Sequence, residues 1–169
     1  MQVLIIRHAP AEDREEFARQ GQPDDLRPLT NQGKAKMCKN VQGLQKIIPQ
    51  IHRIVESPFV RARQTADLLA YAYPRARRQV LSALAPLGSE TAILNYLREN
   101  ANPTHTLALV GHEPDLGELA TWLLSGQADI WMPLKKGSAS LLRFDKEIEA
   151  GEAELGWLLT PRQLRQLAR

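Results

Sequence analysis

Two arginines and two histidines of this 169-residue chain lie where short apolar, strand-like segments end. They are Arg7, His8, Arg61 and His112. A pair of guanidinium groups can hold the oxygens of a phosphoryl group through bidentate hydrogen bonds. One histidine can attack phosphorus through an unprotonated ring nitrogen, and a second, if charged, can donate to the oxygens of the group in transfer. The set is typical of phosphoryl transfer through a phosphohistidine, with fixed cations in the place that Mg²⁺ has in kinases.

Each of these elements has an ordinary structural explanation when it is taken alone. An Arg-His pair after a strand usually forms caps or salt bridges, and Ser57-Pro58 is a usual helix start, with serine as N-cap. The hypothesis of a phosphoryl-transfer site depends on the convergence of these motifs at one edge of the sheet. Ligands of open α/β sheets bind beyond the carboxyl ends of the strands. Helices that begin near Ser57 and Glu113 would add backbone N–H groups and positive dipole ends at that edge.

Apolar runs and helical periodicity predict the elements that position these side chains. Strands are expected at residues 3–6, 51–56, 79–84, 106–110, 138–144 and 153–159. Helices are expected over residues 31–48 and 89–100, and from residues 57, 114 and 160 onward. Residues 9–29 are mostly polar, contain three prolines and are expected to form a long loop.

The alternation of strands and helices predicts an α/β fold. We expect three layers, a mostly parallel central sheet covered by helices on both faces, with the last two strands as an antiparallel pair. At ~150 residues per domain, residues 1–169 are expected to form a single domain. No apolar run approaches the ~18–20 residues of a membrane span, and the first residues lack the pattern of a secretory signal. A cytoplasmic protein without membrane contact is therefore expected.

Charge and cysteine content exclude several classes of site. The chain has 22 basic and 19 acidic residues, a net charge of +3 and 5% aromatics, which argues against dedicated nucleic-acid binding. Its one cysteine, Cys38, excludes an internal disulfide and a zinc site with two or more thiolates. No metal or other cofactor is expected.

The helix at 31–48 carries four lysines, which we interpret as a solvated face, with the docking of an acidic partner as the alternative. Trp131 is expected to pack in the core or to border the site.

Four ordered motifs resemble those of the histidine phosphatase superfamily, and within it those of the SixA-type phosphohistidine phosphatases. They are Arg7-His8, Arg27-Pro28-Leu29-Thr30-x-x-Gly33, Ser57-Pro58-Phe59-Val60-Arg61-Ala62-x-Gln64-Thr65 and Val110-Gly111-His112-Glu113-Pro114. The ending Gly156-Trp157-x-Leu159-x-Pro161-x-x-Leu164 is similar as well, so the resemblance covers essentially the whole chain. It implies a phosphoglycerate-mutase-like core.

The resemblance also implies roles for individual residues. His8 would be the nucleophile that accepts the phosphoryl group. Arg7 and Arg61 would bind phosphate, and His112 would be the second histidine of the pocket. Ala9 stands where the family has a glycine. If Ala9 has a negative φ, its methyl group only narrows the pocket; if its N–H must contact phosphate, affinity falls.

The family's general acid has no single counterpart in this chain. Larger members use a carboxylate in an inserted lid, and 169 residues leave no room for a large insertion. The candidates are Asp24, Asp25 and Glu90, of which the first two are favoured because they lie just before Arg27-Pro28. The alternative is that these carboxylates only solvate loops.

The size of the chain also bears on the substrate. Without a lid, the phosphate site is expected to be open and shallow, so that it admits a phosphorylated side chain of another protein. The leaving group of a P–N bond is easily protonated, so strong acid assistance is less necessary. We therefore expect a monomeric, metal-independent phosphatase that acts on phosphohistidine of a signalling or phosphotransfer protein. The alternatives are a phosphatase for small phosphomonoesters and a non-catalytic module that binds phosphoproteins.

Overall fold

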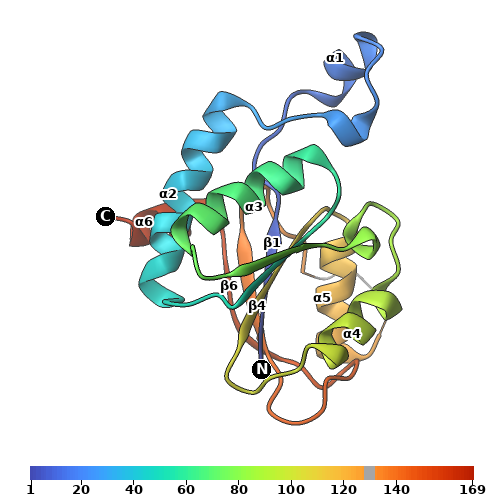
Figure 1. The fold of residues 1–169 in the computed structure, drawn as a ribbon, viewed down its shortest axis with the longest axis vertical. Helices are drawn as coiled ribbons and strands as arrows, with labels where there is room; N and C mark the ends of the chain where they lie inside the picture. Colours follow the sequence, from blue (N-terminus) through green and yellow to red (C-terminus); the bar gives the residue numbers. More distant parts are fainter. Residues whose placement is uncertain (128–131) are drawn as a thin grey trace.

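A six-stranded sheet forms the centre of the molecule, in the order β3-β2-β4-β1-β5-β6 (Figure 1). The computed structural model describes residues 1–127 and 132–169, so Trp131 lies outside the described residues. The strands are β1 (Gln2–Arg7), β2 (Arg53–Glu56), β3 (Arg77–Val80), β4 (Thr106–Gly111), β5 (Ala139–Arg143) and β6 (Glu154–Leu159). The first four strands pair in parallel, whereas β5 pairs antiparallel with both β1 and β6. The predicted sheet, including its antiparallel end, is confirmed.

Helices cover both faces of this sheet, as predicted (Figure 1). They are α1 (Arg14–Arg19), α2 (Asn31–Ile47), α3 (Val60–Ala72), α4 (Glu90–Glu99), α5 (Asp115–Ser125) and α6 (Pro161–Leu167). Short 3-10 helices form at Asp24–Leu26 and Ser82–Leu84. Within the described ranges, no helix is long and apolar enough to cross a membrane.

Three local predictions need correction. Residues 9–29 contain α1 as well as a 3-10 turn, because the side chain of Asp13 caps α1 by accepting from two backbone N–H groups. The strand expected at 79–84 is β3, four residues long and exposed throughout, so apolar patterning could not locate it. Helix α3 begins at Val60, after Phe59, and not at Ser57. The hydroxyl of Ser57 is within hydrogen-bond distance of a histidine ring instead.

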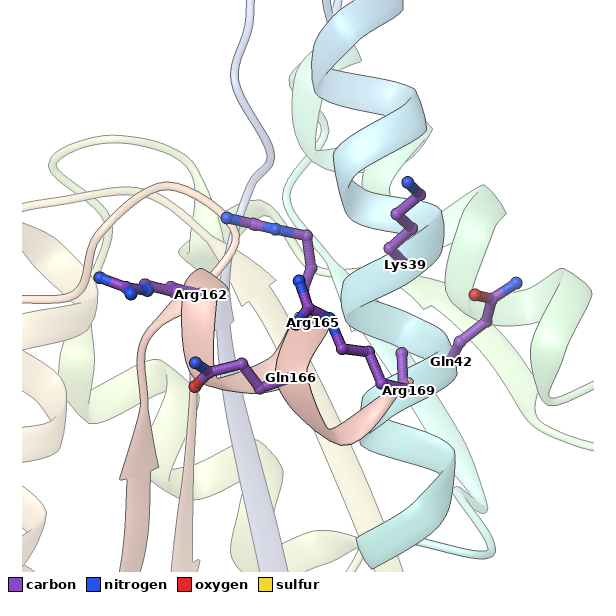
Figure 2. Close-up of a pocket in the computed structure, with 7 residues that line it drawn as sticks. Lys39, Gln42, Arg162, Arg165, Gln166 and Arg169 are labelled. Carbon is purple, nitrogen blue, oxygen red and sulfur yellow. The ribbon is translucent and has the colours of Figure 1, made fainter.

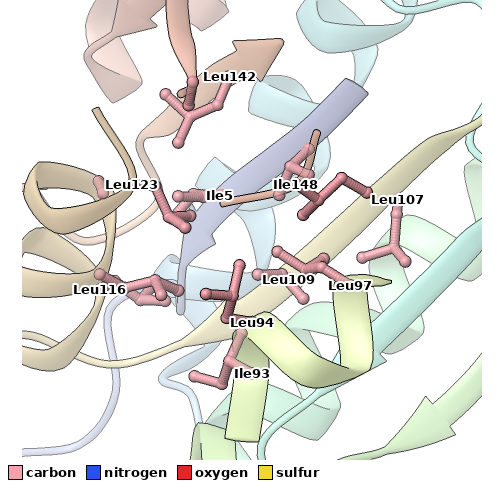
Figure 3. Close-up of a cluster of buried hydrophobic side chains, with 14 of the residues drawn as sticks. Ile5, Ile93, Leu94, Leu97, Leu107, Leu109, Leu116, Leu123, Leu142 and Ile148 are labelled. Atoms are coloured by element: carbon pink, nitrogen blue, oxygen red, sulfur yellow. The ribbon is translucent and has the colours of Figure 1, made fainter. Parts of the chain in front are cut away.

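The core forms two clusters, one on each side of the sheet, and strand β1 contributes to both. Val3 and Ile5 face the cluster beneath α4 and α5, whereas Leu4 and Ile6 face the cluster beneath α2, α3 and α6. All four side chains have no exposed surface. Figure 3 shows Ile5 among leucine and isoleucine side chains of the first cluster. A strand buried on both faces reads as a continuous apolar run, which is why β1 could be recognised in the sequence.

The start of α2 is tied to the segment that follows β1. The side chain of Thr30 caps α2 by accepting from the N–H of Gly33 at 2.8 Å, and the N–H of Thr30 donates to the carbonyl of Pro10 at 3.2 Å. The backbone of Gly33 lies so close that a Cβ there would be 2.0 Å from the carbonyl oxygen of Pro10. The Thr-x-x-Gly motif therefore lets the helix approach the backbone two residues beyond His8.

We predict that Gly33→Ala destabilises the fold. Alanine usually stabilises a helix interior by about 1 kcal/mol relative to glycine, but this methyl group must displace backbone at Pro10. The net loss in the free energy of unfolding should be about 1–2 kcal/mol, measured by urea denaturation. Gln32→Ala, on an exposed neighbouring position, is the control and should change it by less than about 0.5 kcal/mol. Equal stability of the two variants would contradict this account.

Candidate active site

The ends of three strands meet at one edge of the sheet. The register of the parallel pair β1 and β4 places Arg7 beside Gly111, and the N–H of His8 donates to the carbonyl of Gly111 at 3.0 Å. The N–H of Ser57, just after β2, donates to the carbonyl of Val110 at 2.9 Å. Main-chain pairing therefore aligns the three segments that carry the predicted site residues.

A cleft of about 780 Å³ opens at this edge. Its lining includes all four residues singled out in the sequence, Arg7, His8, Arg61 and His112. Eight further charged residues line the cleft: Glu12, Asp13, Arg14, Asp24, Arg27, Glu113, Asp115 and Lys136.

His8 is held as a neutral imidazole with one free nitrogen. Its Nδ1 lies 2.7 Å from the carbonyl oxygen of Ala9, so this nitrogen carries the proton and donates it. Burial lowers the pKa of His8 to about 3; the hydrogen bond to Ala9 opposes this effect, and the charges of His112, Arg61 and Arg7 add to it. At neutral pH the Nε2 lone pair is therefore available to attack an electrophile.

The second histidine is oriented by a serine. Nε2 of His112 lies 2.7 Å from the hydroxyl oxygen of Ser57, which also accepts from the N–H of Phe59 at 3.3 Å. A hydroxyl has one proton and two acceptor lone pairs, so this pair forms with either tautomer: Ser57 donates to Nε2 when the ring proton is on Nδ1, and Nε2 donates to Ser57 when the ring proton is on Nε2. Burial, followed by the charge of Arg61, lowers the pKa of His112 to about 3. The ring centroids of His112 and His8 are 5.2 Å apart.

The two arginines are fixed by carbonyl and carboxylate oxygens. Nη1 of Arg7 donates to the carbonyl of Leu134 at 2.7 Å. Arg61, which is 4% exposed, donates from Nη1 to the carbonyl of Asp24 at 2.7 Å and from Nη2 to its carboxylate at 3.0 Å. Each guanidinium group thus has a defined orientation and further N–H groups to offer.

Three unpaired nitrogen atoms lie around His8. Among the described residues, four buried side-chain polar atoms have no hydrogen-bond partner, and three belong to the predicted site. They are Nε of Arg7 and Nε of Arg61, which are N–H donors, and Nδ1 of His112, which is a donor in the tautomer that carries its proton there. Buried donors are nearly always paired in proteins, and an unmade hydrogen bond costs about 1–3 kcal/mol. This arrangement is suited to the oxygens of a tetrahedral anion placed against His8.

The three carboxylates proposed as acids have different positions. Asp24 lines the cleft and pairs with both Arg61 and Arg27. Burial alone would raise the pKa of Asp24, but its hydrogen bond to Arg27 and the charges of nearby arginines lower it below its ordinary value. Asp24 is therefore an ionised group that orients arginines. Asp25 and Glu90 are not among the described residues that line the cleft.

Two charged residues of the cleft were missed as site residues in the sequence. Glu113 is the next residue after His112, and burial raises its pKa, although the N–H of Leu134 and the charge of Arg7 oppose the rise. Its adjacency to His112 is a usable signal, but the sequence pattern around it indicates the start of a helix. Lys136 precedes β5, and burial lowers its pKa, with further lowering by nearby arginines. Only the pairing of β5 with β1 brings Lys136 to this edge.

Ala9 is accommodated without strain. It does not have a positive φ, and its N–H donates to the hydroxyl of Thr65 at 3.1 Å. The methyl group is fully buried in the cluster beneath α2 and α3 and does not line the cleft. Neither consequence considered for Ala9 therefore applies, because its methyl group does not narrow the pocket and its N–H is used within the fold.

Residues 1–127 and 132–169 contain no group of three or more histidine, cysteine or acidic residues able to hold a metal ion. The charged residues that line the cleft are five cations and five carboxylates.

Comparison with known proteins places this geometry in a family. The model of the histidine phosphatase superfamily (branch 1) matches residues 3–85. An uncharacterized protein of Picosynechococcus sp. is 41% identical over 144 residues, 85% of this chain and 85% of that protein. Phosphohistidine phosphatase SixA of Escherichia coli (strain K12) is 29% identical over 170 residues, which cover 98% of this chain and 97% of that one.

The fold agrees with these sequence relationships. The structure of the protein histidine phosphatase SixA complexed with tungstate superimposes with a TM-score of 0.81 at 26% identity, covering 97% of this chain and 99% of that one. The predicted phosphoglycerate-mutase-like architecture is thereby confirmed. Taken together, the family model, the 41% identical relative and the shared fold show that the chain belongs to the histidine phosphatase superfamily.

Proposed function

We propose that the chain is a metal-independent phosphatase that hydrolyses phosphohistidine through a phosphoenzyme intermediate on His8. The observation that carries the proposal is the set of three buried, unpaired nitrogen atoms of Arg7, Arg61 and His112 around a neutral histidine. The guanidinium N–H groups, together with His112 in the tautomer protonated on Nδ1, match the equatorial oxygens of a phosphoryl group, and His8 offers a lone pair for in-line attack.

The reaction has two displacements at phosphorus. Nε2 of His8 forms a bond to phosphorus while the bond from phosphorus to the substrate's nitrogen breaks, and the leaving imidazole takes up a proton. Water then attacks the phosphorus on His8, which releases inorganic phosphate and restores the neutral histidine. Arg7 and Arg61 stabilise the charge on the phosphoryl oxygens in both steps, and His112 donates through Nδ1.

Glu113 is the proposed proton donor. It lines the cleft, and its raised pKa favours the protonated form to a higher pH than an ordinary glutamate. A phosphohistidine leaving group is protonated easily, whereas the alkoxide of a phosphomonoester needs a stronger contribution from an acid. Glu113 therefore also supports the second candidate function, a phosphatase for small phosphomonoesters.

The substrate assignment is supported by the SixA relatives, since one of them is named phosphohistidine phosphatase. The cleft also suits a protein side chain, because its lining combines residues from six separate stretches of the chain at an open edge of the sheet. We propose a signalling or phosphotransfer protein as the partner, and a cytoplasmic, monomeric enzyme.

A non-catalytic binding module is less well supported. Ala9 uses its N–H within the fold, and the nucleophile His8 and the unpaired nitrogen atoms around it are all present.

We predict that His8→Ala abolishes turnover with the fold intact. Phosphate release from a phosphohistidine protein should fall by at least about a thousandfold, since the covalent route is lost. Brief reaction of the wild type with ³²P-labelled substrate, quenched without acid, should leave label on His8. The control is His105→Ala, which removes a histidine that stacks on His52 outside the cleft, and it should keep both label and turnover. Full activity of His8→Ala would contradict the mechanism.

A second prediction distinguishes the two candidate substrates. Glu113→Gln removes the acidic proton and keeps the acceptor for the N–H of Leu134. Hydrolysis of a small phosphomonoester should slow by about 10²-fold, whereas hydrolysis of phosphohistidine should slow by less than about tenfold. Glu99→Gln, at an exposed position on α4, is the matched control. An equal loss on both substrates would show that Glu113 is not a proton donor to the leaving group.

Metal independence gives a third test. Treatment with EDTA should leave the rate of phosphate release unchanged, because arginine side chains supply the positive charge at the phosphoryl group. This part of the proposal would be contradicted if EDTA treatment lowered the rate and added Mg²⁺ restored it, while removal of EDTA without added Mg²⁺ did not.

A further inference from the structure

A second hollow, away from the catalytic cleft, lies between α2 and α6 and has a volume of about 660 Å³. Figure 2 shows Arg162, Arg165 and Gln166 on α6 beside Lys39 and Gln42 on α2. The remaining lining residues are Ala168 and Arg169. Its lining shares no residue with the catalytic cleft, and nothing in the proposed function uses it.

The charged side chains of this hollow, here called the α2/α6 pocket, are all of one sign. Four of its seven lining residues have cationic side chains and none has an acidic one. The two helices carry six cations between them and no aspartate or glutamate, which exceeds the chain's whole net charge of +3. None of these cations takes part in a salt bridge within the part of the chain that the structure describes. Positive charge is therefore concentrated here without an internal partner.

One cation of the α2/α6 pocket is anchored in the protein interior. Nη1 of Arg165 donates to the side-chain oxygen of Asn40 at 3.0 Å, and Asn40 is only 2% exposed. The amide nitrogen of Asn40 in turn donates to the carbonyl of Gly137 at 2.9 Å. This chain of bonds fixes the guanidinium group with most of its N–H donors still available. Preorganised donors bind an anion at a lower entropic cost than free surface side chains.

The shape and lining of the pocket narrow the class of ligand. A volume of several hundred Å³ is typical of a small-molecule site. No lining residue is aromatic, so the pocket offers no surface on which a nucleobase could stack. Three of the four cations lie on α2 and α6 and the fourth, Arg169, follows α6, so the positive charge is spread over separate segments, as a chain of linked phosphates would require.

We propose that the α2/α6 pocket is a binding site for a small anion that carries two or more linked phosphoryl groups. Arg165 and Arg162 bind terminal oxygens from α6, and Lys39 neutralises the chain from α2. The shared chemistry is that of a free polyphosphate and of the phosphate tail of a nucleotide.

The test is calorimetric titration of the full chain with tripolyphosphate at low ionic strength, where screening is weak. Because the catalytic cleft also contains arginines, the informative quantity is the difference between variants. Lys39→Gln/Arg162→Gln changes two exposed side chains and should lose one binding equivalent, or bind it about tenfold more weakly. The charge-matched control Arg77→Gln/Lys146→Gln, at exposed positions outside the pocket, should behave as the wild type.

A reporter on α2 makes the test specific to this pocket. Cys38 is the only cysteine of the chain, is exposed and precedes Lys39, so it can carry an environment-sensitive fluorophore. Tripolyphosphate should produce a saturable change of signal that Lys39→Gln/Arg162→Gln weakens about tenfold and the control does not. Unchanged binding in the pocket variant, or an equal loss in the control, would overturn the proposal. Loss of catalysis in His8→Ala leaves this result unaffected, so the two proposals fail separately.

Two further ligands define what the pocket recognises. ATP should bind as tripolyphosphate does if only the phosphate chain is contacted, and tighter binding of ATP would identify a nucleotide as the source. Orthophosphate should bind at least about tenfold more weakly, since it spans fewer cations. Equal affinity for orthophosphate and tripolyphosphate would overturn the assignment to linked phosphates.

Discussion

The parallel pairing of β1 with β4 is the constraint on which the site depends. It sets Arg7 opposite Gly111, and the hydrogen bond from His8 to Gly111 extends this register one residue beyond the strand. Parallel strands end at the same edge, so two histidines that are 104 positions apart in the sequence come to lie with ring centroids 5.2 Å apart. A shift of one residue in this pairing would turn the side chains of β1 to the opposite faces of the sheet. Arg7 and His8 would then no longer lie in the cleft beside His112.

The main features of fold and site could be predicted because their signals are local. Val3–Ile6 forms an unbroken apolar run, and such a run marks a strand that is buried on both faces. Arg7 and His8 directly follow this run, so the prediction of the strand also places them at the carboxyl edge of the sheet. His112 is located in the same way by β4. The two layers of helices follow from apolar periodicity, which records which face of each helix is buried.

The remaining features depend on contacts between distant segments. Ser57 matches the pattern of a helix N-cap, but its hydroxyl binds His112, and no local rule contains that partner. Asp24 comes just before Arg27, yet its role depends equally on Arg61 from α3. Lys136 reaches the cleft because β5 adds to the sheet beside β1. In each case the sequence predicts the residue's neighbourhood along the chain, whereas tertiary pairing decides its partner.

Two carboxylates of the cleft, Asp24 and Glu113, show how environment separates chemical roles. Asp24 lies among three arginines, and their combined effect holds its pKa below the ordinary value despite burial. Glu113 has one nearby arginine at greater remove, so burial prevails and its pKa rises. Opposite shifts in one cleft are the usual sign that one acid stays charged while the other holds a proton. The ionised Asp24 therefore orients Arg61, whereas Glu113, next to His112 in the sequence, keeps its proton to a higher pH than an ordinary glutamate.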